Sequence, residues 1–205
     1  MNIAIKPLTP ELSADYFDFF ENRAFTDDSP YRCYCQMYQM TKEQAQAALD
    51  DAEGRDPGRV SREVAERQIA DGVLRGYLAY VDGKSIGWCN ANDRVNYPIE
   101  SCNGARFNMS TGKREKMRVK IVACFEIAPE YRMKGVATAL LARVCEDAKA
   151  EGYIAVEGFP VVRTERFEWD NCGPIRLYQK VGFIKTAEQD NVMVMRKDLK
   201  EQRAK

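Results

Sequence analysis

The sequence predicts an α/β domain in which helices flank a mixed central sheet, and three observations carry this prediction. Residues 119–127 are apolar at nearly every position, which is typical of a strand buried on both faces of a sheet. From Gly135 onward the period changes, and apolar residues recur at helical spacing up to Ala148. Asp82 and Gly83 separate two apolar runs, which is the strongest short-range signal of a β-hairpin.

The composition fits one domain over residues 1–205. A chain of 205 residues with 45% apolar residues can bury one sizeable core. Lys and Arg total 31, as do Asp and Glu, and this balance gives no reason to expect nucleic acid or an anionic membrane as a partner. No apolar run approaches the ~18 residues of a membrane-spanning helix, and the N-terminal segment lacks the apolar core of a signal peptide. We therefore expect a cytoplasmic protein.

Seven cysteines are scattered through a chain that is too long to need disulfide staples, so reduced thiols are expected. They stand at positions 33, 35, 89, 102, 124, 145 and 172. No metal site is expected, because Cys33 and Cys35 are one residue closer than the usual Cys-x-x-Cys pair and the chain has no His. The lack of His also leaves Glu, Asp, Tyr, Cys or water to carry any proton transfer.

The first half of the chain predicts a strand, three helices and the hairpin. Thr9 followed by Pro10 is a helix start, and Thr41 with Gln44 forms a capping box that opens a second helix. Residues 92–117 make a connection longer than a hairpin needs, and such connections are usually functional or disordered. The expected strands are residues 2–6, 77–81 and 85–89, with a loop at 54–58 and the third helix at 61–71.

The second half continues with a strand that leads into the helix beginning near Gly135, which Gly152 can end. Further along we expect a strand at 153–157, a helix at 174–180, a closing hairpin at 183–187 and 192–196, and a charged tail from 197. Together with the strands of the first half, these give a mixed sheet of about six or seven strands.

The turn between the central strand and the helix is a candidate phosphate cradle. Gly135 and Ala137 are small where the helix begins, so an anion could approach the unpaired N–H groups of its first turn. Arg132 and Lys134 add positive charge there. The turn lacks both the Lys-Ser/Thr ending of a P-loop and the three-glycine spacing of a dinucleotide fingerprint.

Two motifs in the second half resemble those of the GNAT N-acyltransferase superfamily. Residues 132–137 resemble its acetyl-CoA-binding pattern, Arg/Gln-x-x-Gly-x-Gly/Ala. Residues 171–183 are similar to its Asn-x-x-Ala-x-x-Leu-Tyr-x-x-x-Gly-Phe, and depart from it only where Pro174 replaces Ala. The motifs stand in the right order with a strand between them, and the resemblance covers roughly the C-terminal half.

The resemblance implies a GNAT fold whose sheet is splayed at the acetyl-CoA site. A bulge near Glu126 would interrupt the pairing with the 153–157 strand and free backbone groups that can bind the pantetheine arm. The pyrophosphate would bind the N–H groups of residues 133–138, with Arg132 and Lys134 as electrostatic support. The implied cofactor-binding residues are Phe125, Glu126, Ile127, Arg132, Met133, Lys134, Gly135, Val136, Ala137, Thr138, Asn171 and Tyr178.

The resemblance further implies an N-acetyltransferase that moves an acetyl group from acetyl-CoA to a primary amine by direct attack. Tyr178 takes the position of the acid for the departing thiolate, although a Tyr there could also simply pack the helix against the sheet. Asn171 is the cofactor-side contact of the motif, or a helix cap. Glu157 and Glu126 are the candidate bases; either could instead be solvated or structurally paired, and water alone could serve.

The acceptor is the part that the sequence leaves open, beyond a small-molecule or peptide amine. Its contacts would come from the N-terminal helices and from an acceptor-side insertion around residues 92–117, with residues 31–38, Trp88, Tyr97 and 167–170 as candidates. A non-catalytic acyl-CoA-binding or regulatory domain is the alternative function, and a cysteine-based redox or metal module is a third. The oligomeric state is also open, a homodimer included.

Overall fold

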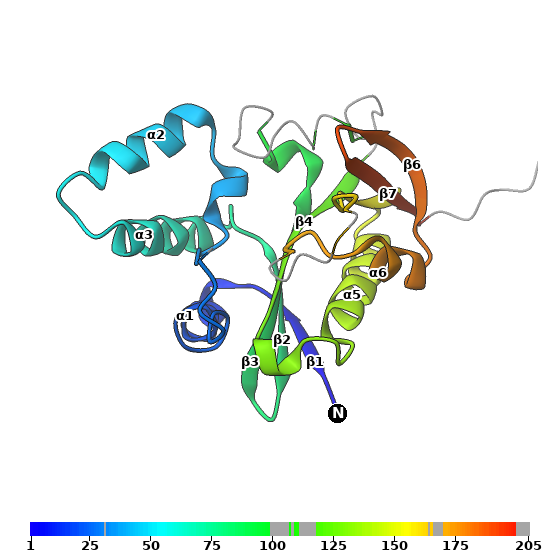
Figure 1. The fold of residues 1–205 in the computed structure, drawn as a ribbon, viewed down its shortest axis with the longest axis horizontal. Coiled ribbons are helices and arrows are strands. Elements are labelled where there is room, and N and C mark those ends of the chain that lie inside the picture. The colour runs from blue at the N-terminus through cyan, green and yellow to red at the C-terminus, as the bar shows by residue number, and fades with distance from the viewer. Residues whose placement is uncertain are drawn as a thin grey trace, which may run out of the picture.

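The structure, a computed structural model, describes residues 1–30, 32–98, 107, 109–110, 118–163, 165 and 170–199, and it confirms the mixed α/β architecture (Figure 1). In this part of the chain the sheet has seven strands in the order β1-β2-β3-β4-β5-β7-β6. The pairing of β4 with β5 is parallel, and the other pairings are antiparallel. The strands are β1 (Ala4–Pro7), β2 (Gly76–Val81), β3 (Lys84–Asp93), β4 (Val119–Ile127), β5 (Ala155–Gly158), β6 (Ile184–Gln189) and β7 (Val192–Asp198).

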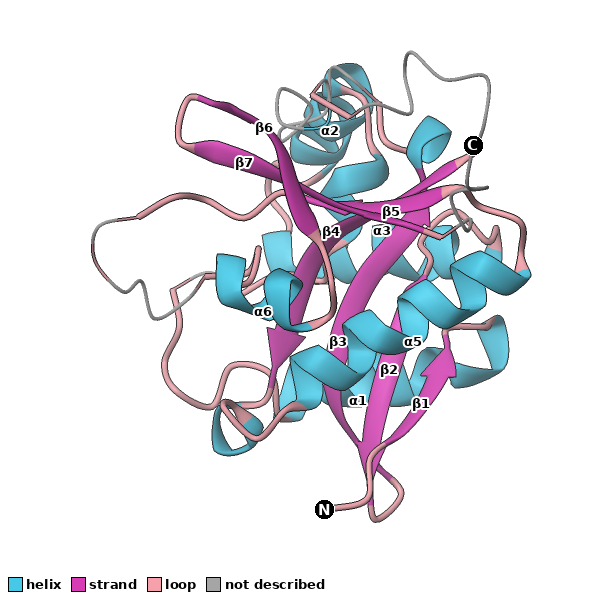
Figure 2. Ribbon diagram, turned by 90° about the vertical axis from the view of Figure 1, so that its right-hand side faces the viewer, coloured by secondary structure: helices cyan, strands magenta, loops and turns pink. Residues whose placement is uncertain are grey.

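Helices cover both faces of the sheet, with α1, α2 and α3 on one side and α5 and α6 on the other (Figures 1 and 2). They are α1 (Ser13–Asn22), α2 (Lys42–Asp51), α3 (Pro57–Ala70), α5 (Val136–Ala150) and α6 (Ile175–Lys180). Each side has its own apolar core: Tyr16 and Trp88 belong to the core under α1, whereas Leu140 and Val144 belong to the core under α5. Apolar burial on both faces is what makes β4 read as a continuous apolar run.

Local signals place most elements within a few residues of their expected positions. The capping box is present, because the Thr41 hydroxyl accepts a hydrogen bond from the Gln44 N–H at 3.2 Å and the Gln44 side chain accepts one from the Thr41 N–H at 2.9 Å. The third helix begins earlier than expected, at Pro57 inside the predicted loop. Asp56 caps it by accepting a hydrogen bond from the Arg59 N–H at 2.9 Å, and proline suits the first helical position.

The hairpin and closing strands are also longer than the sequence indicated. β3 extends to Asp93, and β7 to Asp198, because both continue to pair with neighbouring strands beyond their apolar runs. β5 begins at Ala155 rather than at residue 153, and β1 spans Ala4–Pro7 rather than 2–6.

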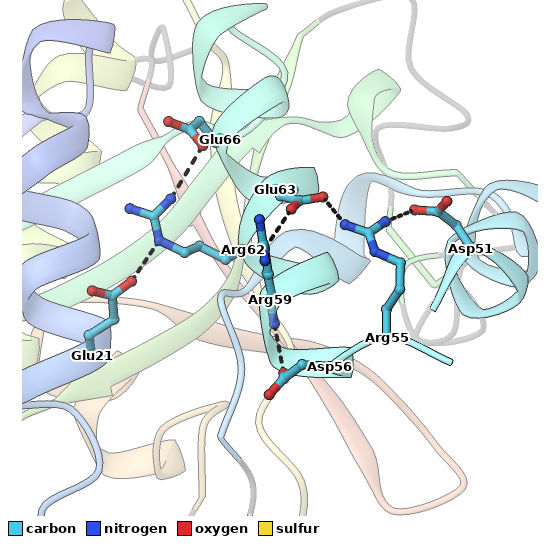
Figure 3. Close-up of polar contacts among 8 residues, drawn as sticks. All are labelled: Glu21, Asp51, Arg55, Asp56, Arg59, Arg62, Glu63 and Glu66. Carbon is cyan, nitrogen blue, oxygen red and sulfur yellow. Dashed lines mark hydrogen bonds and ion pairs between the residues drawn. The ribbon is translucent and has the colours of Figure 1, made fainter. Parts of the chain in front are cut away.

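Two helices, α2 and α3, form what we call the helical arm. α3 packs its buried residues Val60, Val64, Ala65 and Ile69 toward the sheet, but α2 has no buried residue. Figure 3 shows the ion pairs that join these helices to each other and to α1. Arg55 contacts Asp51 at 2.6 Å and Glu63 at 2.7 Å, and Arg62 contacts Glu21 of α1 at 2.8 Å. Surface charge pairs therefore carry much of the attachment of α2.

The long connection predicted at 92–117 lies largely outside the described residues. Its described start forms a short helical turn at Arg94–Asn96, where the Arg94 guanidinium donates to the carbonyl oxygens of Phe107 and Tyr97 at 3.2 and 2.8 Å. Within the described ranges, no helix combines the length and the apolar character needed to cross a bilayer.

Candidate active site

The predicted splay lies between β4 and β5. Their parallel pairing runs from Val119 opposite Ala155 to Val122 opposite Gly158, where β5 ends, while β4 continues to Ile127 paired only with β3. Gly158 has no room for a side chain, because an added Cβ would lie 2.1 Å from the Tyr178 ring. The aromatic ring therefore packs directly on the backbone at the point where the two strands part.

A β-bulge lies on β4, but not where the sequence analysis put it. Asn90 of β3 pairs with Cys124 and the next residue, Ala91, pairs with Val122, so Ala123 is the extra residue. The bulge is thus three residues before Glu126 and interrupts the pairing with β3, not the pairing with β5. The expected site near Glu126 was wrong, because the parting from β5 comes from the end of β5 itself.

This bulge decides where Glu126 points. Strict alternation would place Glu126 on the same face as Val122, but one extra residue reverses the alternation. Val122 and Phe125 both pack in the core under α5, whereas Cys124 packs in the core under α1. Glu126 lies opposite Trp88, whose ring contacts Tyr16 of α1 at 5.0 Å between centroids. The Glu126 carboxylate therefore lies on the α1 side of the sheet, while the preceding residue, Phe125, faces the α5 side.

A cleft of about 1160 Å³ opens where the strands part. Its walls come from the end of β4, the turn before α5, the loop before α6, and the segment after α1. Of the residues assigned to the cofactor, it is lined by Phe125, Glu126, Ile127, Arg132, Met133, Ala137 and Asn171. Those that do not line it are Lys134, Gly135, Val136, Thr138 and Tyr178.

The first turn of α5 has the backbone geometry of a sharp turn into a helix. Gly135 has φ of 88° and Met133 has φ of 61°, so the backbone turns sharply into the helix. No described side chain caps this N-terminus, and an added Cβ on Gly135 would meet nothing within 4 Å. The Val136 side chain is buried in the core, whereas the Met133 and Lys134 side chains before it are exposed. The N–H groups of this turn and the helix dipole favour an anion.

Glu126 has the electrostatics expected of a base. Its side chain is 17% exposed, and burial raises its pKa to about 7, while the nearby Arg132 guanidinium acts in the opposite direction. A carboxylate with this proton affinity is half ionised at neutral pH, so it can accept and release a proton there.

Arg132 does not point toward the first turn of α5. Its Nε donates to the Ile127 carbonyl oxygen at 3.1 Å, its Nη1 donates to Asp27 Oδ2 at 2.5 Å, and its Nη2 lies 3.5 Å from Glu126 Oε1. The sequence analysis assigned this guanidinium to the pyrophosphate. In the structure its three nitrogens contact groups on the opposite side of the turn.

Glu157, the other candidate base, lies outside the cleft. It is fully buried, and its two oxygens accept hydrogen bonds from Ser110 Oγ at 2.5 Å and from Arg196 Nη1 at 3.0 Å. This is the structurally paired arrangement that the sequence analysis kept open for it. A carboxylate held in a buried ion pair is poorly placed to meet an incoming amine.

Tyr178 lies beneath the cleft at the end of β5. Its hydroxyl donates to the Cys172 carbonyl oxygen at 2.7 Å, and its ring contacts Phe125 and Phe183 at centroid distances of 6.4 and 5.4 Å. Burial raises its pKa well above the ordinary value, so the hydroxyl keeps its proton at neutral pH. The residue thus combines the packing role with the protonation state that an acid needs.

Asn171 links the loop before α6 to the open edge of β4. Its carbonyl oxygen accepts from the Phe125 N–H at 2.7 Å, and its side chain donates to the Tyr38 hydroxyl at 3.2 Å. The expectation that the Phe125 N–H is freed by the splay is therefore wrong in this structure, because the loop occupies it. Nor does Asn171 cap α6, whose N-cap is Pro174.

The structure adds residues that the sequence analysis did not assign to the site. Ser29, Cys33 and Cys124 line the cleft on the α1 side, and Asp27 holds Arg132. No local signal in the sequence connects Asp27 with a residue 105 positions further on.

The described cysteines are free thiols, and Cys102 lies outside the described residues. In the same described ranges, no group of three or more His, Cys, Asp or Glu side chains could hold a metal ion.

Comparison with known proteins matches this geometry to one family. The model of the acetyltransferase (GNAT) family matches residues 31–183. No curated protein matches the sequence. Among solved structures, an acetyltransferase of the GNAT family from Streptococcus pneumoniae is similar, with a TM-score of 0.55 and 18% identity over 97% of this chain and 100% of that chain.

Two further similar structures contain a ligand. The PaiA N-acetyltransferase from Thermoplasma acidophilum, in complex with coenzyme A, has a TM-score of 0.53 and 15% identity over 97% of this chain and 99% of that chain. YncA from Salmonella typhimurium, with its cofactor acetyl-CoA, has a TM-score of 0.52 and 16% identity over 98% of this chain and 96% of that chain. At these identities the likeness concerns the fold.

Proposed function

Because the chain belongs to the acetyltransferase (GNAT) family and is thus an acyltransferase, we propose that it moves an acetyl group from acetyl-CoA to a primary amine by direct attack. One observation carries this proposal. The cleft is lined together by the end of β4 beyond its pairing with β5, by Ala137 in the uncapped first turn of α5 and by Glu126.

The cofactor fits the side of the cleft that faces α5. The pyrophosphate meets the N–H groups of residues 133–138, where the helix dipole favours an anion, and Lys134 adds a positive charge nearby. The pantetheine arm lies along the open edge of β4 between Phe125 and Ile127, where it has to take the place of the Asn171 carbonyl. A cleft of about 1160 Å³ exceeds the ~300–1,000 Å³ that one small ligand usually fills, which leaves space for an acceptor.

The acceptor fits the side of the cleft that faces α1. Glu126, Ser29 and Cys33 line this side, and the carboxylate is directed there by the bulge at Ala123. An amine nitrogen in its uncharged form attacks the thioester carbonyl carbon, the C–N bond forms and the C–S bond breaks. Glu126 accepts the proton that the nitrogen loses, and the geometry supports Glu126 over Glu157 because only Glu126 lines the cleft.

We assign to Tyr178 the proton that the departing thiolate takes, from a buried position behind the lining of the cleft. Its hydroxyl lies beside Gly158 at the end of β5, where an added Cβ would be 2.7 Å from the oxygen. To donate to sulfur, the O–H turns away from the Cys172 carbonyl and afterwards regains its proton from solvent. Hydrogen bonds in a ligand-free site commonly rearrange in this way when the substrate binds.

The test is thiol release from acetyl-CoA in the presence of a panel of amines: tyramine, agmatine, spermidine, free amino acids and a lysine-containing peptide. We expect saturable calorimetric binding of acetyl-CoA, and thiol release with at least one amine that is matched mole for mole by the acetylated product. Binding of acetyl-CoA without any transfer would favour the non-catalytic acyl-CoA-binding alternative. No affinity for acetyl-CoA would refute the proposal.

A further inference from the structure

The Arg132 side chain departs from what its place in the phosphate-binding turn predicts. Each of its three guanidinium nitrogens contacts an oxygen on the far side of the turn, from Ile127, Asp27 and Glu126. The side chain is 26% exposed and lines the cleft, and these three contacts hold its guanidinium. A group fixed in this way is not available to a pyrophosphate at the first turn of α5.

We propose that Asp27 and Arg132 form a positioning pair for Glu126, in which Asp27 fixes the guanidinium and the guanidinium fixes the carboxylate that accepts the amine proton. This inference rests on the proposed function of Glu126 as a base. It assigns Arg132 to the acceptor side of the reaction, and it gives Asp27, in the segment after α1, a role in the chemistry.

The geometry supports this order of contacts. The Arg132–Asp27 contact is the shorter, at 2.5 Å, and the Nε bond to the Ile127 carbonyl at 3.1 Å fixes the plane of the guanidinium. With two edges held, the remaining Nη2 faces Glu126 Oε1 at 3.5 Å. A planar guanidinium held at several points is pre-organised, which a lysine could not reproduce.

The groups around Glu126 determine how strongly Arg132 influences the pKa of its carboxylate. Among the described residues, the groups that interact electrostatically with Glu126 besides Arg132 and Asp27 include three thiols: Cys33 from the segment after α1, Cys124 on β4, and Cys35, which is hydrogen-bonded to Cys124. The hydrogen bond with Cys35 and then burial raise the pKa of Cys124 well above its ordinary value, so this thiol stays uncharged near neutral pH. Arg132 is a nearby cation that opposes the effect of burial on the Glu126 carboxylate.

The test is an NMR pH titration of protein with isotope-labelled glutamate carboxyl groups, in which the Glu126 signal is identified by its loss in Glu126→Gln. In Arg132→Gln the midpoint of this signal should rise by about one pH unit, because the carboxylate loses its nearby cation. Arg132→Lys keeps the charge but not the three contacts, so its Glu126 midpoint should lie between those of the native protein and Arg132→Gln. An unchanged midpoint in a folded Arg132→Gln protein would overturn the proposal.

Lys134→Gln is the matched control from the same turn. The Lys134 ammonium lies over the Tyr131 ring at 5.7 Å, so its removal should leave the Glu126 midpoint in place and weaken coenzyme A binding instead. For Arg132→Gln, calorimetric titration should show that coenzyme A binding is nearly unchanged, with a change of less than about twofold in Kd. If Arg132→Gln lowered the affinity for coenzyme A tenfold or more, Arg132 would contact the pyrophosphate after all, and the positioning role would be refuted.

The role of Asp27 is tested by a double-mutant cycle on the same signal. If Asp27 acts through Arg132, the shift caused by Asp27→Asn must differ between the native and the Arg132→Gln backgrounds. Equal shifts in both would mean that Asp27 acts on Glu126 by its own charge alone. These readouts need no turnover, so a failure of the proposed acetyl transfer and a failure of the positioning pair remain distinguishable.

Discussion

The α5 side of the sheet and the outer helix α2 are held in place in different ways. On the α5 side, the site depends on backbone geometry and buried packing: the positive φ of Gly135, the end of β5 at Gly158 and the Tyr178 ring pressed against it. The helical arm on the other side relies on exposed ion pairs, and α2 buries no residue. The difference suggests that the cofactor side is fixed by the fold, while the arm beside the acceptor side can change at little cost in stability.

The largest effect should come from the residue that joins the two sides. Glu126→Gln removes the proton acceptor, so kcat/KM for an amine identified in the panel should fall about 100-fold, while the Kd for acetyl-CoA stays similar. The native enzyme should lose activity as the pH falls through about 7, because protonation of Glu126 removes the base. In Glu126→Gln this acidic limb should disappear. If Glu126→Gln kept its activity and its loss of activity below about pH 7, Glu126 would be excluded as the base.

Identical Gly→Ala substitutions compare the stability of the two sides. At Gly158 the new methyl would lie 2.1 Å from the Tyr178 ring, so the free energy of unfolding should fall by about 2 kcal/mol. At Gly58, in the exposed first turn of α3, the methyl meets only the Asp56 carboxylate at 3.0 Å, and the change should be within about 0.5 kcal/mol. Chemical denaturation measures both variants. Equal losses would contradict the distinction between the two sides.

Tyr178→Phe separates chemistry from packing on the cofactor side. The ring stays in place against Phe125 and Phe183, but the hydroxyl is lost, so kcat should fall about tenfold or more with little change in the KM for acetyl-CoA. Stability should also fall by about 1 kcal/mol, because the Cys172 carbonyl loses its donor. A stability loss with unchanged kcat would leave Tyr178 only the packing role.

The cofactor side could be anticipated from the sequence because its signals are local. A change of apolar period, Gly135 at a helix start and an Asp-Gly turn each depend on a few neighbouring residues, and the elements they predict are present. The capping box at Thr41 also predicted the start of α2 correctly, although α2 lies in the arm. Features that depend on a few neighbouring residues can thus be predicted from the sequence in any part of the fold.

The contacts that complete the site were not readable, because they join distant parts of the chain. Asp27 reaches Arg132 across 105 positions, and the Asn171 carbonyl takes the Phe125 N–H that the motif alone would leave open. The bulge at Ala123 depends on how β3 pairs with β4, which the sequence of β4 does not show. Its consequence is that Glu126, which strict alternation would turn toward α5, faces the α1 side of the sheet instead.

The smallest effect should come from the arm, and it tests whether surface charge is what attaches α2. Arg55 bridges Asp51 of α2 and Glu63 of α3, and because these are exposed ion pairs, Arg55→Gln should lower the free energy of unfolding only slightly at low salt. The difference from the native protein should shrink further in high salt, because exposed charges are screened. Hydrogen exchange of α2 should rise, while acetyl-CoA affinity stays unchanged. A loss of several kcal/mol would mean instead that the arm is packed as firmly as the cofactor side.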